Sequence, residues 1–501
     1  MKKYRFAYRL TALGAAICFF ISALEFSKMF SLPLKTGDGL SSSVISGGIR
    51  DFETMMHAVA ALIICALLLG VTVVCYKKAM IAEGGYRLFE SKRKEFSVFH
   101  LFLIIAAAFA MVSIAFLSVH RETVWSHLLS GRGYDEYMDF FNHITYARYP
   151  AETYYETHHA CCPALAYIFY YAISKILPME ATIKFNSEMT SPYAMLVYVF
   201  YVILLCCLLV YLVKKMLPQK GKAVTVFTVL LLLSNFFIST IERGNSVFIV
   251  LLLLMGAMIL RDSEKPWQRE VALILIAVAA GFKVYPAIFG LLYLVEKRYK
   301  EAVRLVLYGV VLFFLPFAFF GGVEGLMQFL KNQGVVQELE EISLQSVRAS
   351  VRYASEKLTG VPNGFVTLEK WLPIAFGAVN LLGILSKKTQ LWEKVFLLSA
   401  IMVFVPSWSG SYTPIYFAIP MILFFSQCQK NDKFTPSKPY SIVITVCFAL
   451  AFSMIFLVRA DGELMSNLSY LALYAIDAIV LVKALYLAIT AIINKRLLGR
   501  D

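Results

Sequence analysis

Residues 194–213, AMLVYVFYVILLCCLLVYLV, contain no charged side chain and are followed directly by Lys214 and Lys215. An apolar run of about 20 residues is the length that a helix needs to cross ~30 Å of hydrocarbon. Comparable runs recur along the 501-residue chain, which is 59% hydrophobic and only 16% charged. This composition excludes an ordinary soluble protein and predicts an all-α, polytopic transmembrane protein, because a helix satisfies its own backbone inside a membrane.

The predicted fold has about 12–14 spans. The count has a range because the runs 270–282 and 285–296 are each short for a span and are able to form a broken pair around Val284–Tyr285–Pro286. The first run follows the basic start MKKYRFAYRL but lacks a convincing cleavage site, so we interpret it as a retained span or signal anchor. The runs lie near 8–30, 55–76, 98–119, 194–213, 223–240, 246–260, 270–282, 285–296, 303–320, 371–386, 391–407, 412–427, 440–458 and 466–493.

The formal net charge of +14 comes largely from basic clusters at one set of helix ends. This distribution follows the positive-inside rule and places these loops and both termini in the cytoplasm of a plasma-membrane protein. The positive net charge is therefore explained by the orientation of the protein in the membrane, and no nucleic-acid partner is predicted. The outer side then carries residues 120–193, residues 321–370 and the WSGSY turn at 408–412. The clusters include Lys77, Lys78, Lys92, Arg93, Lys94, Lys214, Lys215, Lys220, Lys222, Lys297, Arg298, Lys300, Lys387, Lys388, Lys495 and Arg496.

A polar stretch in the first outer loop is the best candidate for chemistry. Residues 120–160, HRETVWSHLLSGRGYDEYMDFFNHITYARYPAETYYETHHA, hold five of the seven histidines. Asp135 and Asp139 are four residues apart and share a face if this part is helical. Two carboxylates on one face suit a general base or a metal ligand, and a solvated acidic turn is the alternative. The pair His158–His159 has no third ligand at zinc-like spacing, so no metal is predicted there.

Two other outer segments are predicted to be partly helical. Residues 161–177, CCPALAYIFYYAISKIL, are too short for a comfortable span, and a crossing there would break the positive-inside alternation. We therefore expect an interfacial helix with tyrosines at headgroup depth. Residues 321–370 form a long polar segment, which is expected to shape the site where an acceptor substrate binds.

Two isolated cations lie at the outer ends of apolar runs. Arg243 lies in STIERGNSVF and Lys283 in AAGFKVYPAIF. Ionisable residues at membrane depth are costly unless paired, so they are functional candidates, although both side chains are long enough to reach the interface. Facing an acidic loop, the two cations suit a lipid-linked phosphate held beside a catalytic carboxylate.

The order of these motifs resembles that of the GT-C superfamily of membrane glycosyltransferases, most closely glycosyltransferase family 87. In chain order, the motifs are D-x-x-x-D-F-F-N in an outer loop, R-G-N between two spans, K-x-Y-P at a helix break, the basic turn EKRYK and a late S-W-S-G-S-Y. The resemblance covers about residues 98–430 and departs from the family pattern at Cys161–Cys162–Pro163, where an aromatic–Pro–Pro is usual. It implies a domain of residues 1–97 with two N-terminal transmembrane helices, a catalytic core of 98–430 and a C-terminal hairpin of 431–501.

The resemblance also implies roles for particular residues. Asp139 is the first choice for the catalytic base and Asp135 the second. The remaining candidates come from the motifs and from the histidine pair. For the donor phosphate they are Arg243, Lys283, Tyr285 and Asn245, and for the rest of the substrates they are Asn142, His159, Trp408 and Tyr412.

The predicted activity is the transfer of a sugar, mannose being one candidate, from a polyprenyl-phosphate carrier to a glycolipid or cell-envelope glycan of a bacterium. The reaction would be one inverting displacement on the outer face, with membrane lipids around it and without a metal or other cofactor. A transporter or flippase of lipid-linked glycans is an alternative, although the chain shows no internal repeat. A polymerase or ligase of such glycans is another, and only the motif order argues against it.

Overall fold

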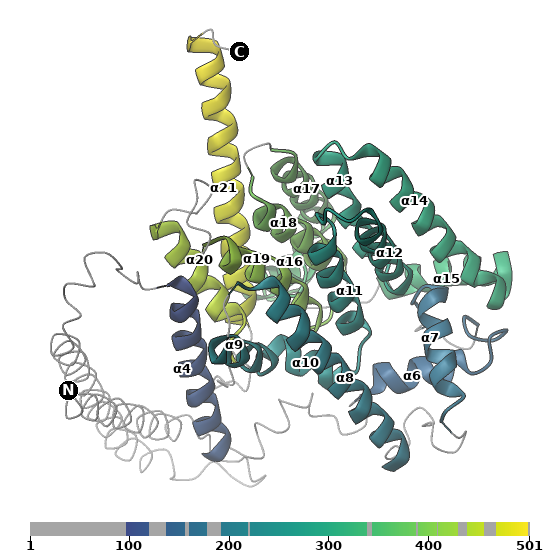
Figure 1. Ribbon diagram of the computed structural model, residues 1–501. Coiled ribbons are helices and arrows are strands. Elements are labelled where there is room, and N and C mark those ends of the chain that lie inside the picture. Colours follow the sequence, from purple (N-terminus) through teal and green to yellow (C-terminus); the bar gives the residue numbers. More distant parts are fainter. Residues whose placement is uncertain are drawn as a thin grey trace. The chain divides into compact units, whose positions relative to one another are not determined.

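The computed structural model describes residues 97–119, 137–155, 160–177, 192–218, 221–337, 343–386, 389–407, 409–428, 438–454 and 467–498. Every regular element in these ranges is helical, which confirms the predicted all-α class (Figure 1). The two spans predicted before residue 97 lie outside the described residues. The domain boundaries at residues 97 and 430 stay predictions.

The chain divides into two compact units. One comprises residues 1–131 and 453–466, and its described part consists mainly of α4 (Val98–Val119). Within this unit the Ser113 hydroxyl donates a hydrogen bond to the Met454 carbonyl at 2.6 Å. The other unit comprises residues 132–452 and 467–501 and contains every other described element.

The larger unit is built from α-helices joined in places by short 3₁₀ helices. The first group is α6 (Met138–Ala147), α7 (Ala164–Ser174), α8 (Pro192–Met216), α9 (Lys222–Leu232), α10 (Asn235–Arg243), α11 (Val247–Leu260) and α12 (Pro266–Phe282). The second is η2 (Tyr285–Gly290), α13 (Leu291–Val295), α14 (Tyr299–Phe314), η3 (Leu315–Phe319), α15 (Gly322–Gln337), α16 (Val347–Thr359) and α17 (Val366–Leu385). The third is α18 (Leu391–Phe404), η4 (Thr413–Phe417), α19 (Ala418–Cys428), α20 (Lys438–Ala451) and α21 (Asn467–Leu498).

Five helices in the described ranges are long and apolar enough to cross a membrane, and the bent pair α9–α10 makes a sixth candidate. The two members of this pair meet at 61°. This confirms a polytopic membrane protein, while the total of 12–14 spans stays a prediction because the search covers only the described residues. The five candidates are Val98–Ala115, Tyr193–Met216, Tyr299–Phe319, Val366–Leu385 and Leu468–Leu487.

The helix break predicted around Val284–Tyr285–Pro286 is present. Helix α12 ends at Phe282, and the 3₁₀ helix η2 begins at Tyr285 with Pro286 in its first turn. Proline fixes φ and lacks an N–H, so it is tolerated at a helix start but not inside a continuing α-helix. The chain therefore turns at Lys283 and Val284 instead of continuing as one span.

Helix α12 is the central element for the site. It packs between α11 and α14 and also contacts α7 (Figure 1). At Gly281 a Cβ atom would approach the end of the Leu165 side chain of α7 to 2.5 Å and its Cβ atom to 3.1 Å, so the glycine lets the two helices pack closely without displacing the leucine. The short helix α7, whose interfacial placement stays a prediction, is thereby held against the end of α12 that carries Lys283.

Candidate functional site

A cavity of about 290 Å³ lies where several segments that are distant in the sequence meet. Its wall is formed by helix α6, the segment before α7, the residues just before α11, the break between α12 and η2, helix α15 and the turn before η4. The lining residues are Asp139, Asn142, His143, Tyr146, Cys161, Pro163, Asn245, Lys283, Val284, Tyr285, Gln333, Val336, Gly410, Tyr412 and Thr413.

Asp139, in the first turn of α6, is held by two side chains of the α10–α11 turn. Arg243 donates from Nη2 to Asp139 Oδ1 at 2.6 Å, and Asn245 donates from Nδ2 to Asp139 Oδ2 at 2.7 Å. The aspartate and arginine side chains are 15% and 22% exposed. Both carboxylate oxygens are therefore oriented, and the ionised form is stabilised by charge-assisted hydrogen bonds.

The R-G-N motif makes this geometry possible through its glycine. Gly244 caps α10 with φ of 67°, a left-handed conformation that glycine adopts without steric cost. A Cβ atom at Gly244 would also lie 2.8 Å from the Phe140 Cβ atom of α6. The turn therefore brings α6 close to the end of α10, with Arg243 and Asn245 on either side. Asn245 is itself oriented, because its Oδ1 accepts the Val247 N–H at 3.1 Å.

Lys283 reaches the same cavity from the end of α12. Its Nζ donates to Cys162 Sγ at 3.4 Å, and the His143 Nε2 atom lies 3.6 Å from the same sulfur. Next to the lysine, the Tyr285 hydroxyl lies 3.2 Å from that of Tyr416. The lysine ammonium thus has a sulfur partner at the cavity wall, and no carboxylate within ion-pair distance among the described residues.

Residues 183–409 match the sequence model of glycosyltransferase family 87. This part of the chain is a glycosyltransferase family 87 domain. The family is one of membrane glycosyltransferases of GT-C type, so the predicted resemblance is confirmed. The chain matches no curated protein and no solved structure at a significant level.

The family 87 match includes the R-G-N and K-x-Y-P motifs but begins after Asp139. The structure brings most of the predicted site residues together, since six of the ten line the cavity and Arg243 contacts Asp139. Asp135, His159 and Trp408 lie outside the described residues. The roles of all ten stay predictions.

Several residues at the cavity of this glycosyltransferase were missed by the sequence reasoning. Gln333 and Val336 reach it from α15, within residues 321–370, which were expected to form an outer loop and to shape an acceptor site. Gln333 also donates a hydrogen bond to the Cys161 carbonyl. The adjacent cysteines were visible as a departure from the family pattern, but no spacing in the sequence connects them with α15.

The surroundings of the cavity shift the pKa values of two of its neighbouring groups in opposite directions. Burial, and to a lesser degree the nearby Asp139 carboxylate, raises the pKa of Tyr146 to about 12, so its hydroxyl is a neutral donor at physiological pH. A hydrogen bond from Cys161 lowers the pKa of the Cys162 thiol well below its usual range against the effect of burial, and His143 and Lys283 lower it further. A thiolate at Cys162 would keep the Lys283 ammonium charged inside the protein.

Within the described ranges, no group of three His, Cys, Asp or Glu side chains is placed to hold a metal ion. The arrangement instead offers an oriented carboxylate, a cation and neutral hydroxyl and amide groups around one small cavity. These are the groups needed for proton abstraction from a hydroxyl and for binding a phosphate.

Proposed function

We propose that this membrane glycosyltransferase moves a sugar from a polyprenyl-phosphate carrier to an acceptor hydroxyl in the cavity around Asp139. The observation that carries the proposal is the placement of Asp139 and Lys283 on the same cavity. A base is thereby available for the acceptor and a cation for the donor phosphate. The cavity, about 290 Å³, has the volume for a sugar head but not for a polyprenyl chain, which would lie outside it.

In the proposed reaction, the acceptor oxygen attacks the anomeric carbon and Asp139 takes the proton of the hydroxyl. The bond between the anomeric carbon and the phosphate oxygen breaks, and its electron pair leaves with the polyprenyl phosphate. A positioned base of this kind contributes typically ~10²–10⁴-fold to the rate. Because attack and departure occur on opposite faces of the sugar, one displacement inverts the anomeric configuration.

Lys283 would stabilise the leaving group. The negative charge on the phosphate grows as the bond breaks, and a cation fixed beforehand stabilises that growth without reorganisation. The Lys283–Cys162 contact holds the ammonium at the cavity wall before the donor binds. Tyr285 and Tyr412, which line the same cavity, would donate hydrogen bonds to the phosphate and the sugar.

Arg243 was predicted to bind the donor phosphate, and its contact with Asp139 gives it an additional role. Together with Asn245 it fixes the direction in which the Asp139 oxygens face. A guanidinium carries five N–H donors in a planar fork, so one edge can hold the carboxylate while another faces an anion. We assign Arg243 first to the orientation of the base and second to the donor.

We further propose that the reaction takes place on the outer face of a bacterial plasma membrane, with mannose as the first sugar to test. The acceptor would be a glycolipid or a cell-envelope glycan. Asn142 supports a substrate contact, because its amide lines the cavity and has no hydrogen-bond partner among the described residues. Its two donors and one acceptor oxygen suit a sugar hydroxyl.

The test uses purified protein in detergent with radiolabelled polyprenyl-phosphate mannose and extracted membrane glycolipids. Formation of a mannosylated lipid together with free polyprenyl phosphate is expected, and the Asp139→Asn variant serves as the control for activity of contaminants. Because detergent removes the sealed compartment, transfer under these conditions excludes a pure transporter. The anomeric configuration of the product, measured by NMR, should be inverted, and retention would contradict the single displacement.

A further inference from the structure

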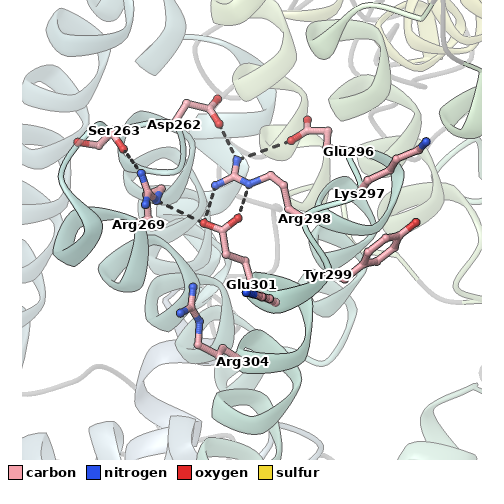
Figure 2. Close-up of a pocket in the computed structure, with 10 residues that line it drawn as sticks. Asp262, Ser263, Arg269, Glu296, Lys297, Arg298, Tyr299, Glu301 and Arg304 are labelled. Carbon is pink, nitrogen blue, oxygen red and sulfur yellow. Dashed lines mark hydrogen bonds and ion pairs between the residues drawn. The ribbon is translucent and has the colours of Figure 1, made fainter.

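A second, larger cleft lies at the other end of α12 from Lys283. It measures about 890 Å³ and is formed by the α11–α12 turn, the α13–α14 turn and the first turns of α12 and α14 (Figure 2). The 17 residues of α12 separate the two sites by roughly 25 Å of helix rise. The lining residues are Asp262, Ser263, Arg269, Glu296, Lys297, Arg298, Tyr299, Lys300, Glu301 and Arg304.

An ion-pair network forms the floor of this cleft. Arg298 contacts Asp262 at 2.7 Å and also pairs with Glu301, which accepts a further contact from Arg269 at 3.5 Å (Figure 2). Glu296 pairs with the buried Arg261 below it. All three carboxylates of the lining are thereby neutralised by arginines, and the cations of the rim are left in excess.

The rim of the cleft carries exposed cations. Lys297 and Lys300 are exposed and have no ion pair among the described residues. Arg304 is 45% exposed and contacts Glu270 at 2.9 Å. Lys297 also has φ of 60°, a left-handed conformation that disfavours a side chain and is commonest at glycine. This residue ends helix α13, since the Arg298 N–H beyond it donates to the Tyr293 carbonyl at 2.8 Å, and the turn sets a cation at the rim.

An apolar groove of about 710 Å³ continues from this cleft, and Tyr299 lines both. The groove runs between α12, the η2–α13 segment and α14. Its α14 wall includes Val303 and Val306, which are 60% and 63% exposed. An apolar surface of this size on a candidate membrane span is expected to face lipid.

Two aromatic side chains mark the level of the membrane interface beside the cleft. Trp267, near the start of α12, is 61% exposed, and Tyr299, at the start of α14, is 58% exposed. Tryptophan and tyrosine are enriched at headgroup depth, where one end of the ring is apolar and the other is wet. The cations therefore lie at headgroup level, and the groove lies at the level of the acyl chains.

We propose that the cleft and the groove together bind one anionic phospholipid. Lys297, Lys300 and Arg304 contact its phosphate, and one acyl chain follows the groove between α12 and α14. A free anion would use only the cleft and a neutral lipid only the groove, whereas an anionic lipid uses both. The site lies in the leaflet opposite the catalytic cavity, which the basic residues predict to be the cytoplasmic one.

The two halves of the site can be removed separately. The double variant K297Q/K300Q removes two exposed cations that stabilise no ion pair of the cleft. Gly309→Leu fills the groove, because a Cβ atom at Gly309 meets no atom within 4 Å and leucine is a better helix former. The matched control K214Q/K215Q removes two exposed lysines at the end of α8, which do not line the cleft.

The measurement is native mass spectrometry of the purified full chain in detergent with equimolar dioleoyl phosphatidylglycerol and dioleoyl phosphatidylcholine. Wild type and K214Q/K215Q should retain one phosphatidylglycerol in preference to phosphatidylcholine. K297Q/K300Q should bind phosphatidylglycerol roughly 30-fold more weakly, as expected for the loss of two cations near an anionic headgroup. Gly309→Leu should weaken the binding of both lipids.

A further variant separates binding from folding. Lys297→Gly should keep or raise the melting temperature, because glycine adopts φ of 60° without strain, while it lowers the preference for phosphatidylglycerol. Equal binding of the two lipids by wild type, or unchanged binding in K297Q/K300Q and Gly309→Leu, would overturn the proposal. Displacement of the lipid by equimolar glycerol 3-phosphate would reassign the cleft to a soluble anion, and displacement by polyprenyl phosphate would reassign it to the carrier lipid.

Discussion

The replacement of Asp139 by asparagine tests the proposed chemistry most directly. Asparagine keeps the shape of the side chain but cannot take a proton from the acceptor. The expected loss of turnover is ~10²–10⁴-fold, which corresponds to about 2.7–5.5 kcal/mol of transition-state stabilisation. Asp135→Asn is expected to do less, since Asp139 is the first choice for the base.

The surroundings of Asp139 also allow its structural contribution to be estimated. Asn245 cannot turn its amide freely, because its Oδ1 accepts the Val247 N–H. An asparagine at 139 therefore points its own NH₂ group either at the Asn245 Nδ2 donor or at Arg243, and one of the two hydrogen bonds is lost. Loss of a bond to a charged group costs about 1.5–3 kcal/mol, and the partial exposure of the Asp139–Arg243 pair puts the expected value at the lower end.

The assay must separate these two effects. Turnover at saturating donor is measured together with the dissociation constant of polyprenyl-phosphate mannose and with the melting temperature. Asn245→Ala is the matched control, because it removes one hydrogen bond to the carboxylate but keeps the base, and about a tenfold loss is expected from one such bond. Asp139 is not the base if folded Asp139→Asn protein retains turnover within tenfold of wild type, or if its whole deficit lies in donor binding.

Further predictions concern the donor, the R-G-N turn and the topology. Lys283→Gln should weaken donor binding and lower turnover, each by about 10- to 100-fold, and Lys283→Arg should restore both in part. If a binding titration gives wild type and Lys283→Gln the same affinity for the donor, the lysine does not bind the phosphate. Gly244→Ala should lower the melting temperature, because its φ of 67° and the 2.8 Å approach both disfavour a Cβ atom, and turnover should fall with it; an unchanged thermal melt would contradict the tight turn. In sealed cells without native cysteines, membrane-impermeant thiol reagents should label cysteines placed at Gly133 and Gln345 but not one at Glu83, and labelling at Glu83 would reverse the predicted orientation.

Much of the candidate site could be predicted because the chemistry of its residues stands out against an apolar background. Arg243 and Lys283 are conspicuous as isolated cations, and Asp139 as a carboxylate in a polar loop. Their spacing in the sequence does not reveal which of these side chains contact each other. The ion pair between Arg243 and Asp139 was therefore missed, and both cations were expected to face the donor phosphate.

The sequence by itself determined that the protein is helical and lies in a membrane, because long apolar runs are a local property and the bilayer admits few structures. It also placed the break before Pro286, where a local steric rule operates. The tertiary structure alone decided that Gln333 of α15 reaches the cavity of α6 and that Cys162 contacts Lys283. Such contacts depend on how helices distant in the chain pack, through close approaches such as those at Gly244 and Gly281, and no local pattern of residues encodes the partners that meet there.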